Sequence, residues 1–155
     1  MIRGEGNEFI AGVSAQEVFD FVLDPAQYTK ADTKITGVTR IAETLDGMVA
    51  REDGLFLGFA PGSVITHYRW LAPYSIDVTL VRGAIKGMHA WFEIREEAGG
   101  THLRHVEEVE FGWGPIGWIH DLALQRWWQA SVATEVSEIA RLMREGERGK
   151  GLAAL

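Results

Sequence analysis

Hydrophobic and polar positions follow a helical pattern near the start of the chain, after a first strand predicted over 5–12. Residues 13–24 carry an apolar face and contain Ser14-Ala15-Gln16-Glu17, in which the serine and glutamate side chains can cap each other's backbone amides. Pro25 disfavours helical geometry in the residue before it but suits a first helical position. The pattern therefore predicts two short helices in succession, the second ending near Lys30.

Between residues 35 and 112 the pattern changes to short stretches rich in β-branched and aromatic residues, separated by Gly and Pro. These stretches predict strands over 35–43, 47–57, 63–71, 75–82, 86–96 and 101–112. Because the connections between consecutive strands are short, we expect the strands to pair antiparallel in chain order.

The last part of the chain returns to a helical period. Apolar residues recur there at spacings of three or four: Leu124, Trp128, Val132, Val136, Ile139 and Met143. This stripe predicts one long helix from about Pro115 to Glu145, with that face on the sheet. We expect Gly146 to end the helix, so that residues 1–146 form a single domain and 147–155 a flexible tail.

The charges on the last two strands predict their register. A four-residue connection, Glu97 to Gly100, pairs Glu96 with Thr101 and places Phe92 opposite His105. Opposite charges then meet on one face and apolar residues dominate the other. A two-residue connection would place Arg95 against Arg104, and a three-residue connection would place Ile94 against Arg104, so we prefer the four-residue connection.

In this register two ionisable residues, His105 and Glu107, interrupt the inward apolar row of the last strand, about 7 Å apart. Burying both is costly without partners, so they either satisfy each other in an ordinary buried network or mark a polar site in an apolar cavity. On the second reading they are candidate catalytic residues. The candidate ligand-binding residues are Phe92, His105, Glu107, Val109, Phe111 and Trp128.

Composition narrows the functional classes. The 155 residues are 46% hydrophobic and 24% charged, as in a folded protein, and the net charge of -7 argues against a nucleic-acid partner or an anionic membrane surface. The absence of cysteine excludes a disulfide framework, a thiolate metal site and a cysteine nucleophile. No apolar run reaches the roughly 18 residues that span a bilayer, so we expect a soluble, cytoplasmic protein.

Sequence motifs for several chemistries are missing. The chain has no Gly-x-Ser-x-Gly elbow and no His-Glu-x-x-His, so we predict neither a serine hydrolase nor a metal site. Residues 112–117 imitate a dinucleotide fingerprint but open the terminal helix, so we predict no cofactor. The apolar run at 55–59 beside a Gly/Pro turn indicates a pocket lip or a subunit contact, which leaves a homodimer open.

Two segments resemble a known family. The first resembles the opening of the SRPBCC superfamily and consists of residues 14–21 leading into Asp24-Pro25-Ala26-Gln27-Tyr28. The second resembles a later segment of the same superfamily: residues 100–111, a Gly-Thr turn followed by alternating His, Glu and Phe. The likeness is to its polyketide cyclase/dehydrase and lipid-transport branch, and the order of elements matches over residues 5 to 146. Many members carry a Trp shortly after the Tyr, where this chain has Ala31.

The resemblance implies an α+β helix-grip (START-like) fold: a curved antiparallel seven-stranded sheet wrapped on a long C-terminal helix, with two short helices after the first strand. Members hold apolar small molecules between sheet and helix, and some catalyse cyclisation or dehydration. Two functions stay open. The first is binding or transport of a small hydrophobic molecule, such as a lipid, polyketide or isoprenoid-like compound.

The second function is that of an aromatase/cyclase- or dehydratase-like enzyme. His105 and Glu107 would then be its acid/base pair, with Tyr68 or Arg69 as orienting groups. A bare interaction module is a third option, but it explains the inward polar pair least well.

Overall fold

The computed structural model describes residues 1–56, 60–112 and 117–153 of the chain. Its elements are β1 (Ile2–Ala11), α1 (Ala15–Leu23), α2 (Pro25–Ala31), β2 (Ile35–Glu43), β3 (Gly47–Phe56), β4 (Ala60–Leu71), β5 (Ser75–Gly83), β6 (Gly87–Glu97), β7 (Gly100–Glu110) and α3 (Gly117–Ala153). One seven-stranded sheet has the order β1-β7-β6-β5-β4-β3-β2, and all neighbours are antiparallel. The predicted α+β fold is confirmed.

The two short helices begin where the sequence predicts. The Glu17 amide donates to the Ser14 hydroxyl at 3.3 Å, and the Ser14 amide donates to the Glu17 carboxylate at 2.9 Å. Asp24 then caps α2 by accepting from the Ala26 amide at 2.9 Å, with Pro25 in the first turn. This local hydrogen bonding makes the entry to both helices independent of the sheet.

The last hairpin has the predicted register. Glu96 pairs with Thr101 and Phe92 with His105 across β6 and β7, and Gly99 in the connection has φ +86°. Because strand side chains alternate between faces, His105 and Glu107 both point to the inner face, where both are buried.

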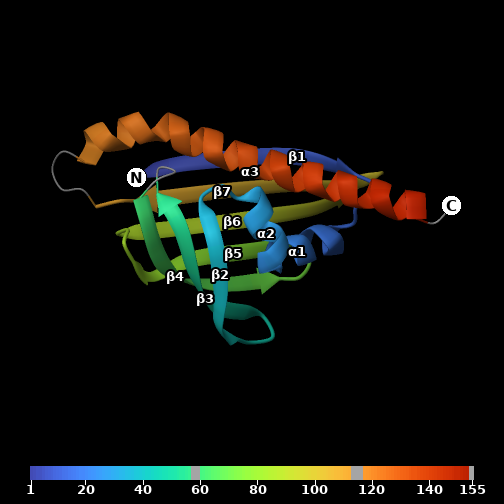
Figure 1. The fold of residues 1–155 in the computed structure, drawn as a ribbon, viewed down its shortest axis with the longest axis horizontal. Helices are drawn as coiled ribbons and strands as arrows, with labels where there is room; N and C mark the ends of the chain where they lie inside the picture. Colours follow the sequence, from blue (N-terminus) through green and yellow to red (C-terminus); the bar gives the residue numbers. More distant parts are fainter. Residues whose placement is uncertain (57–59, 113–116, 154–155) are drawn as a thin grey trace.

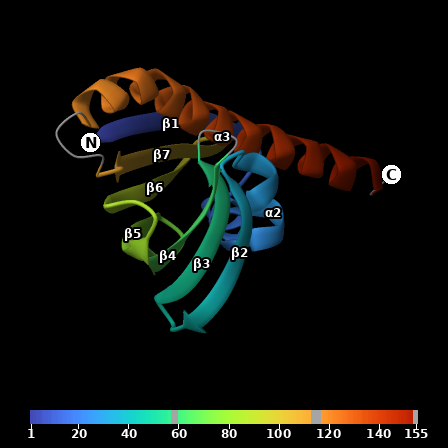
Figure 2. The same ribbon diagram turned by 60° about the vertical axis from the view of Figure 1, so that its left-hand side comes forward.

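Figures 1 and 2 show the layers of the molecule. The sheet curves so that β2 and β3 lean away from β1, and α3 runs along the β1 edge. The short helix α2 packs against both α3 and β2, and α1 packs beneath β6 and β7. The concave face of the sheet is therefore covered by helices at one end and along one edge.

Two glycines let α3 lie directly on β1. A Cβ atom at Gly4 would lie 2.6 Å from Val132 Cγ2, and one at Gly6 would lie 2.6 Å from Val136 Cγ2. Both valines belong to the predicted apolar stripe and are fully buried. No other residue type would allow this separation without displacing the helix.

The open edge of β1 is covered by glutamine side chains of the same helix. The backbone amide of Arg3 donates to Gln125 Oε1 at 3.1 Å, and that of Glu5 donates to Gln129 Oε1 at 3.0 Å. The Gln129 amide group returns a bond of 2.7 Å to the Glu5 carbonyl. These bonds satisfy backbone groups that an edge strand otherwise leaves unpaired.

The predicted end of the long helix was wrong. The backbone of α3 stays helical through Gly146 to Ala153, and its last turns extend past the sheet in Figure 2. A glycine inside a helix costs only about 1 kcal/mol. Arg141 also ties successive turns together by donating to Glu138 at 2.7 Å and to Glu145 at 2.9 Å. The predicted start at Pro115 lies outside the described residues.

None of the helices in the described part of the chain combines the length and the apolar character needed to cross a membrane.

The glycine contacts predict a specific sensitivity. Gly6→Ala should lower the free energy of unfolding by about 1–3 kcal/mol, because the added methyl meets Val136 and the helix must shift. The control is Gly37→Ala in β2, where a Cβ atom would meet nothing within 4 Å. Urea denaturation of both variants measures the difference. Equal stability of the two variants would contradict the close approach.

Candidate functional site

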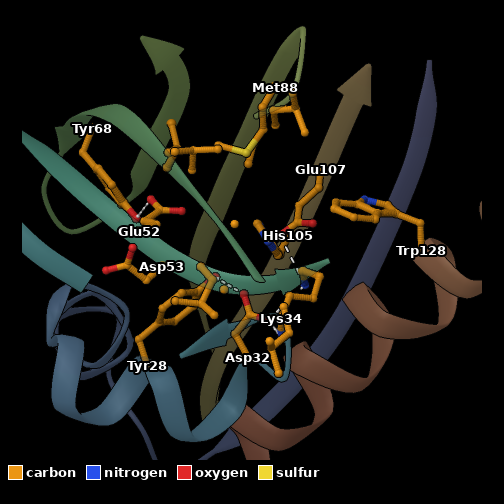
Figure 3. A pocket seen from close by; sticks show the side chains of 18 of the residues that line it. Tyr28, Asp32, Lys34, Glu52, Asp53, Tyr68, Met88, His105, Glu107 and Trp128 are labelled. Carbon is orange, nitrogen blue, oxygen red and sulfur yellow. Dashed lines mark hydrogen bonds and ion pairs between the residues drawn. The ribbon is translucent and has the colours of Figure 1, made fainter. Parts of the chain in front are cut away.

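A cavity lies between the concave face of the sheet, α2 and α3. Its volume is about 80 Å³, which is room for a small organic group, and it is partly open to solvent, so a larger ligand would extend out of it. Figure 3 shows polar residues on two sides of it: Lys34, His105 and Glu107 toward α3, and Glu52 and Tyr68 on the opposite side. The lining residues are Val22, Tyr28, Asp32, Lys34, Ile35, Glu52, Asp53, Gly54, Leu55, Gly62, Val64, Tyr68, Val78, Ile85, Met88, Ala90, Phe92, His105, Glu107, Trp127 and Trp128.

Four of the six predicted ligand-binding residues line this cavity: Phe92, His105, Glu107 and Trp128. The other two are not among the lining residues. Val109 and Phe111 pack instead in an apolar cluster that also contains Ile2, Trp128 and Val132.

Some of the residues predicted to orient a ligand or to form the pocket lip also line the cavity, and others do not. Tyr68 lines the cavity, whereas Arg69 is exposed, because adjacent residues of β4 point to opposite faces. Leu55 lines the cavity, and the rest of the predicted lip at 57–59 lies outside the described residues. Ala31 is fully buried in the main core cluster rather than at the cavity wall.

His105 is held on both ring nitrogens. Its Nδ1–H donates to the Trp91 carbonyl at 3.0 Å, and its Nε2 lies 3.1 Å from Glu107 Oε1 and 3.4 Å from Glu135 Oε1. The ring stacks on Phe92 with centroids 3.8 Å apart and planes 5° apart. Since all its partners accept hydrogen bonds, this geometry suits the imidazolium form.

Lys34 brings the positive charge that the surrounding carboxylates require. Its Nζ lies 2.8 Å from Glu135 Oε2, 3.2 Å from Asp32 Oδ1 and 3.5 Å from Glu107 Oε1. The same ammonium lies 5.7 Å from the centre of the Trp128 ring. Lys34 thus joins the loop after α2 to β7 and α3 at a single buried point.

Tyr28 completes the network from α2. Its hydroxyl donates to Glu135 Oε1 at 2.6 Å and lies 3.5 Å from Asp32 Oδ2. Asp32 also accepts from the Lys34 backbone amide at 2.7 Å. Glu135 is therefore bonded by groups from α2, the following loop and β7.

One carboxyl oxygen of the network has no donor. Asp32, Glu107 and Glu135 together have six carboxyl oxygens, and five of them lie within 3.5 Å of a donor group, two of these sharing the one Tyr28 hydroxyl. The sixth, Glu107 Oε2, is buried, and no described residue offers it a hydrogen bond. The indole Nε1 of Trp128 is also buried, with no acceptor among the described residues.

A second polar group lies on the opposite wall. Glu52 of β3 accepts from the Thr66 hydroxyl at 2.6 Å and from the Tyr68 hydroxyl at 2.5 Å. Burial raises the pKa of Glu52, although these two hydrogen bonds oppose that shift. Figure 3 shows Glu52 and Tyr68 across the cavity from His105.

The neighbouring carboxylates raise the pKa of both basic residues of the network, Lys34 and His105. Burial by itself lowers the pKa of Lys34, but Glu107, Glu135 and Asp32 raise that pKa well above its ordinary value. Burial likewise lowers the pKa of His105, and Glu135 and Glu107 more than reverse that effect. Burial, and then the nearby Glu135 charge, raises the pKa of Asp32. Lys34 is therefore a cation at neutral pH, and the network favours the protonated form of His105 over that of a free imidazole.

His105, Glu107 and Glu135 present ligand atoms within 4.8 Å of one another, close enough to hold a metal ion. The sequence spacing did not indicate this arrangement, because the third ligand comes from α3. However, the Lys34 ammonium already lies against both carboxylates and supplies positive charge at that point. We therefore assign the three side chains to a Lys34-centred ion network.

Sequence reasoning missed several residues of this site. Glu135 continues the spacing of the buried helix stripe, being three residues after Val132, so a charge on that stripe was a visible signal. Glu52 likewise follows Met48 and Ala50 on the inner face of β3. Lys34 and Asp32 lie in an irregular connection, where no periodicity marks a buried residue.

Solved structures share this architecture. A START superfamily protein from Mycobacterium smegmatis aligns with a TM-score of 0.70 at 20% identity, over 91% of this chain and 98% of its own. The Zhui aromatase/cyclase from Streptomyces sp. R1128 aligns with a TM-score of 0.69 at 16% identity, over 92% and 95%. The di-domain ARO/CYC StfQ of the steffimycin biosynthetic pathway aligns at 0.74 and 11% identity, over 96% of this chain and 52% of StfQ.

The fold is therefore the START-like helix-grip fold, which START proteins and polyketide aromatase/cyclases share. This chain spans about half the length of the di-domain StfQ. No protein-family model matches the sequence. No curated protein has significant sequence similarity to it. At these identities the likeness defines the fold, and the function must be argued from the site.

The ion network predicts a large effect of removing its central cation. Lys34→Met should lower the free energy of unfolding by about 3–5 kcal/mol near neutral pH, because it leaves buried carboxylates without their counter-charge. The loss should shrink at acidic pH, where the carboxylates gain protons. Urea denaturation at both pH values measures it, with the exposed Lys30→Met as the control. Equal losses for the two variants would contradict a central role for Lys34.

The raised pKa of His105 predicts a pH dependence of stability. A group whose pKa is higher in the folded state contributes fully below its unfolded value, here 6.5, and this contribution is lost as pH rises through the folded pKa. We expect the free energy of unfolding to fall as pH rises above 6.5, and His105→Gln to flatten that fall. His102→Gln, on the opposite face of β7, is the control. Parallel pH profiles for wild type and His105→Gln would contradict the imidazolium assignment.

Proposed function

We propose that the protein binds a small, largely apolar molecule in the cavity between the sheet, α2 and α3. The observation that carries this proposal is the cavity itself: apolar walls from Val64, Val78, Met88 and Phe92, with polar groups at two places, the Lys34 network and the Glu52–Tyr68 pair opposite it. Ligand sites combine mostly apolar walls with a few orienting polar groups in this way.

The position of the cavity supports the proposal. It opens between a curved sheet and covering helices, in a fold that structurally similar START proteins and aromatase/cyclases share. A lipid, polyketide or isoprenoid-like ligand would suit its walls, and carriage of such a ligand within the cytoplasm is the corresponding cellular role.

Filling the cavity tests this proposal. The apolar fluorophore N-phenyl-1-naphthylamine should gain emission on binding, and Ala90→Leu should suppress the gain because Ala90 lines the cavity from β6. Ala130→Leu, exposed on α3, is the matched control. Native mass spectrometry of protein from its own host then identifies a co-purified molecule. Unchanged emission with Ala90→Leu would place the dye elsewhere and contradict the proposal.

An aromatase/cyclase- or dehydratase-like activity is the alternative. The open Glu107 Oε2 favours it, since a carboxylate aimed at bound substrate can remove a proton beside a carbonyl. His105 is occupied on both nitrogens, so it would position Glu107 and supply positive charge rather than touch the substrate. In this version of the acid/base pair, Glu107 is the catalytic residue: it takes the proton beside the carbonyl and passes it to the departing hydroxyl, which leaves as water when its C–O bond breaks.

Turnover of a synthetic β-hydroxy ketone tests the alternative. If the protein is an enzyme, Glu107→Gln should abolish dehydration while substrate affinity changes only a few-fold, and His105→Ala should shift the pH profile of the remaining activity. Glu108→Gln, on the outer face of β7, is the control. The absence of product with the unmodified protein would contradict this activity and leave binding alone.

A further inference from the structure

We propose that the cavity selects a neutral ligand by its hydroxyl group, which donates a hydrogen bond to Glu107 Oε2 and accepts one from Trp128 Nε1–H. This inference rests on the proposed binding function and names the class of ligand that the cavity takes: alcohols or phenols with an apolar body, and not carboxylates.

The first support is the fixed orientation of the Glu107 carboxylate. Its Oε1 faces the His105 Nε2–H at 3.1 Å and the Lys34 ammonium at 3.5 Å, so this oxygen is committed to the protein. Its Oε2 is buried and lacks a donor among the described residues. Buried polar atoms are rarely left unpaired, and each such atom calls for a partner.

The second support is the neighbouring indole. Trp128 lines the same cavity, and Figure 3 shows its ring beside the Glu107 side chain. Its Nε1–H is a buried donor with no acceptor in the described part of the chain. An unpaired acceptor and an unpaired donor therefore belong to two residues that line the same cavity. A hydroxyl group satisfies both, since it donates one hydrogen bond and accepts others.

The third support is the charge of the surrounding network. Two cations, Lys34 and His105, face three carboxyl groups, those of Asp32, Glu107 and Glu135. The carboxyl groups therefore outnumber the cations by one, and Glu52 adds another on the opposite wall. A ligand carboxylate would bring further negative charge beside Glu107 Oε2, where repulsion opposes it.

Three ligands with the same para-ethylphenyl body test this selection: para-ethylphenol, para-ethylanisole and para-ethylbenzoate. Each is titrated against bound N-phenyl-1-naphthylamine at neutral pH, and loss of dye emission measures its affinity. The phenol should bind at least ~10-fold more tightly than the anisole, because the methyl ether leaves Glu107 Oε2 buried and unpaired. The benzoate should bind most weakly of the three.

Two variants separate the two contacts. In Glu107→Gln the amide oxygen should stay toward Lys34 and His105, so the NH2 group replaces Oε2 and the preference for phenol over anisole should disappear or reverse. Trp128→Phe should weaken the phenol and the anisole alike, because both can accept from the indole. Glu108→Gln, on the outer face of the same strand, should leave all three affinities unchanged.

The outcomes distinguish this inference from the proposed function. Failure of the dye to bind at all would overturn the proposed function, and this inference with it. If the dye binds but the three ligands compete equally, or the benzoate competes best, the cavity is a ligand site and the hydroxyl selection is wrong. If Trp128→Phe affects neither the phenol nor the anisole, the two-contact subsite is also wrong. Because the wild-type series alone decides the selection, the test holds even if Glu107→Gln does not fold.

Discussion

The close packing of α3 on β1 is the contact on which the cavity depends. Because Gly4 and Gly6 have no side chains, Val132 and Val136 lie directly against the strand, and Gln125 and Gln129 reach its open edge. This contact between α3 and β1 fixes the rotation of the helix about its axis. The residues at the neighbouring positions of the same stripe, Trp128 and Glu135, are thereby directed toward the site rather than to solvent.

The ion network beneath α3 depends on the contact between α3 and β1. Glu135 can meet Lys34 and His105 only when α3 lies in this place, and each of these partners comes from a different part of the fold. Several buried charges are tolerated because nearly every oxygen has a donor. The one that does not, Glu107 Oε2, is directed by the same network that satisfies the others. The same residues thus form a structural ion network and orient the oxygen that we propose binds a ligand.

This arrangement bears on the choice between binding and catalysis. A carboxylate held by a lysine and a histidine is well oriented for hydrogen bonding to a ligand. An ordinary buried network, considered from the sequence alone, explains His105 fully. It does not explain Glu107 Oε2 and Trp128 Nε1, both buried with no partner among the described residues. Those two atoms favour a ligand.

The sequence by itself determined the elements whose signals are local or periodic. The capping residues fixed the starts of α1 and α2, and cross-strand charges fixed the β6–β7 register. That register placed His105 and Glu107 on the inner face. Tertiary structure alone decided what they meet, because Lys34 lies in an irregular loop and Glu135 is 28 residues beyond Glu107 on another element. The hydrophobic periodicity of the sequence predicts to which face of its own helix or strand a side chain points. Partners from distant elements are set by how helix and sheet pack, and no spacing in the chain encodes that contact.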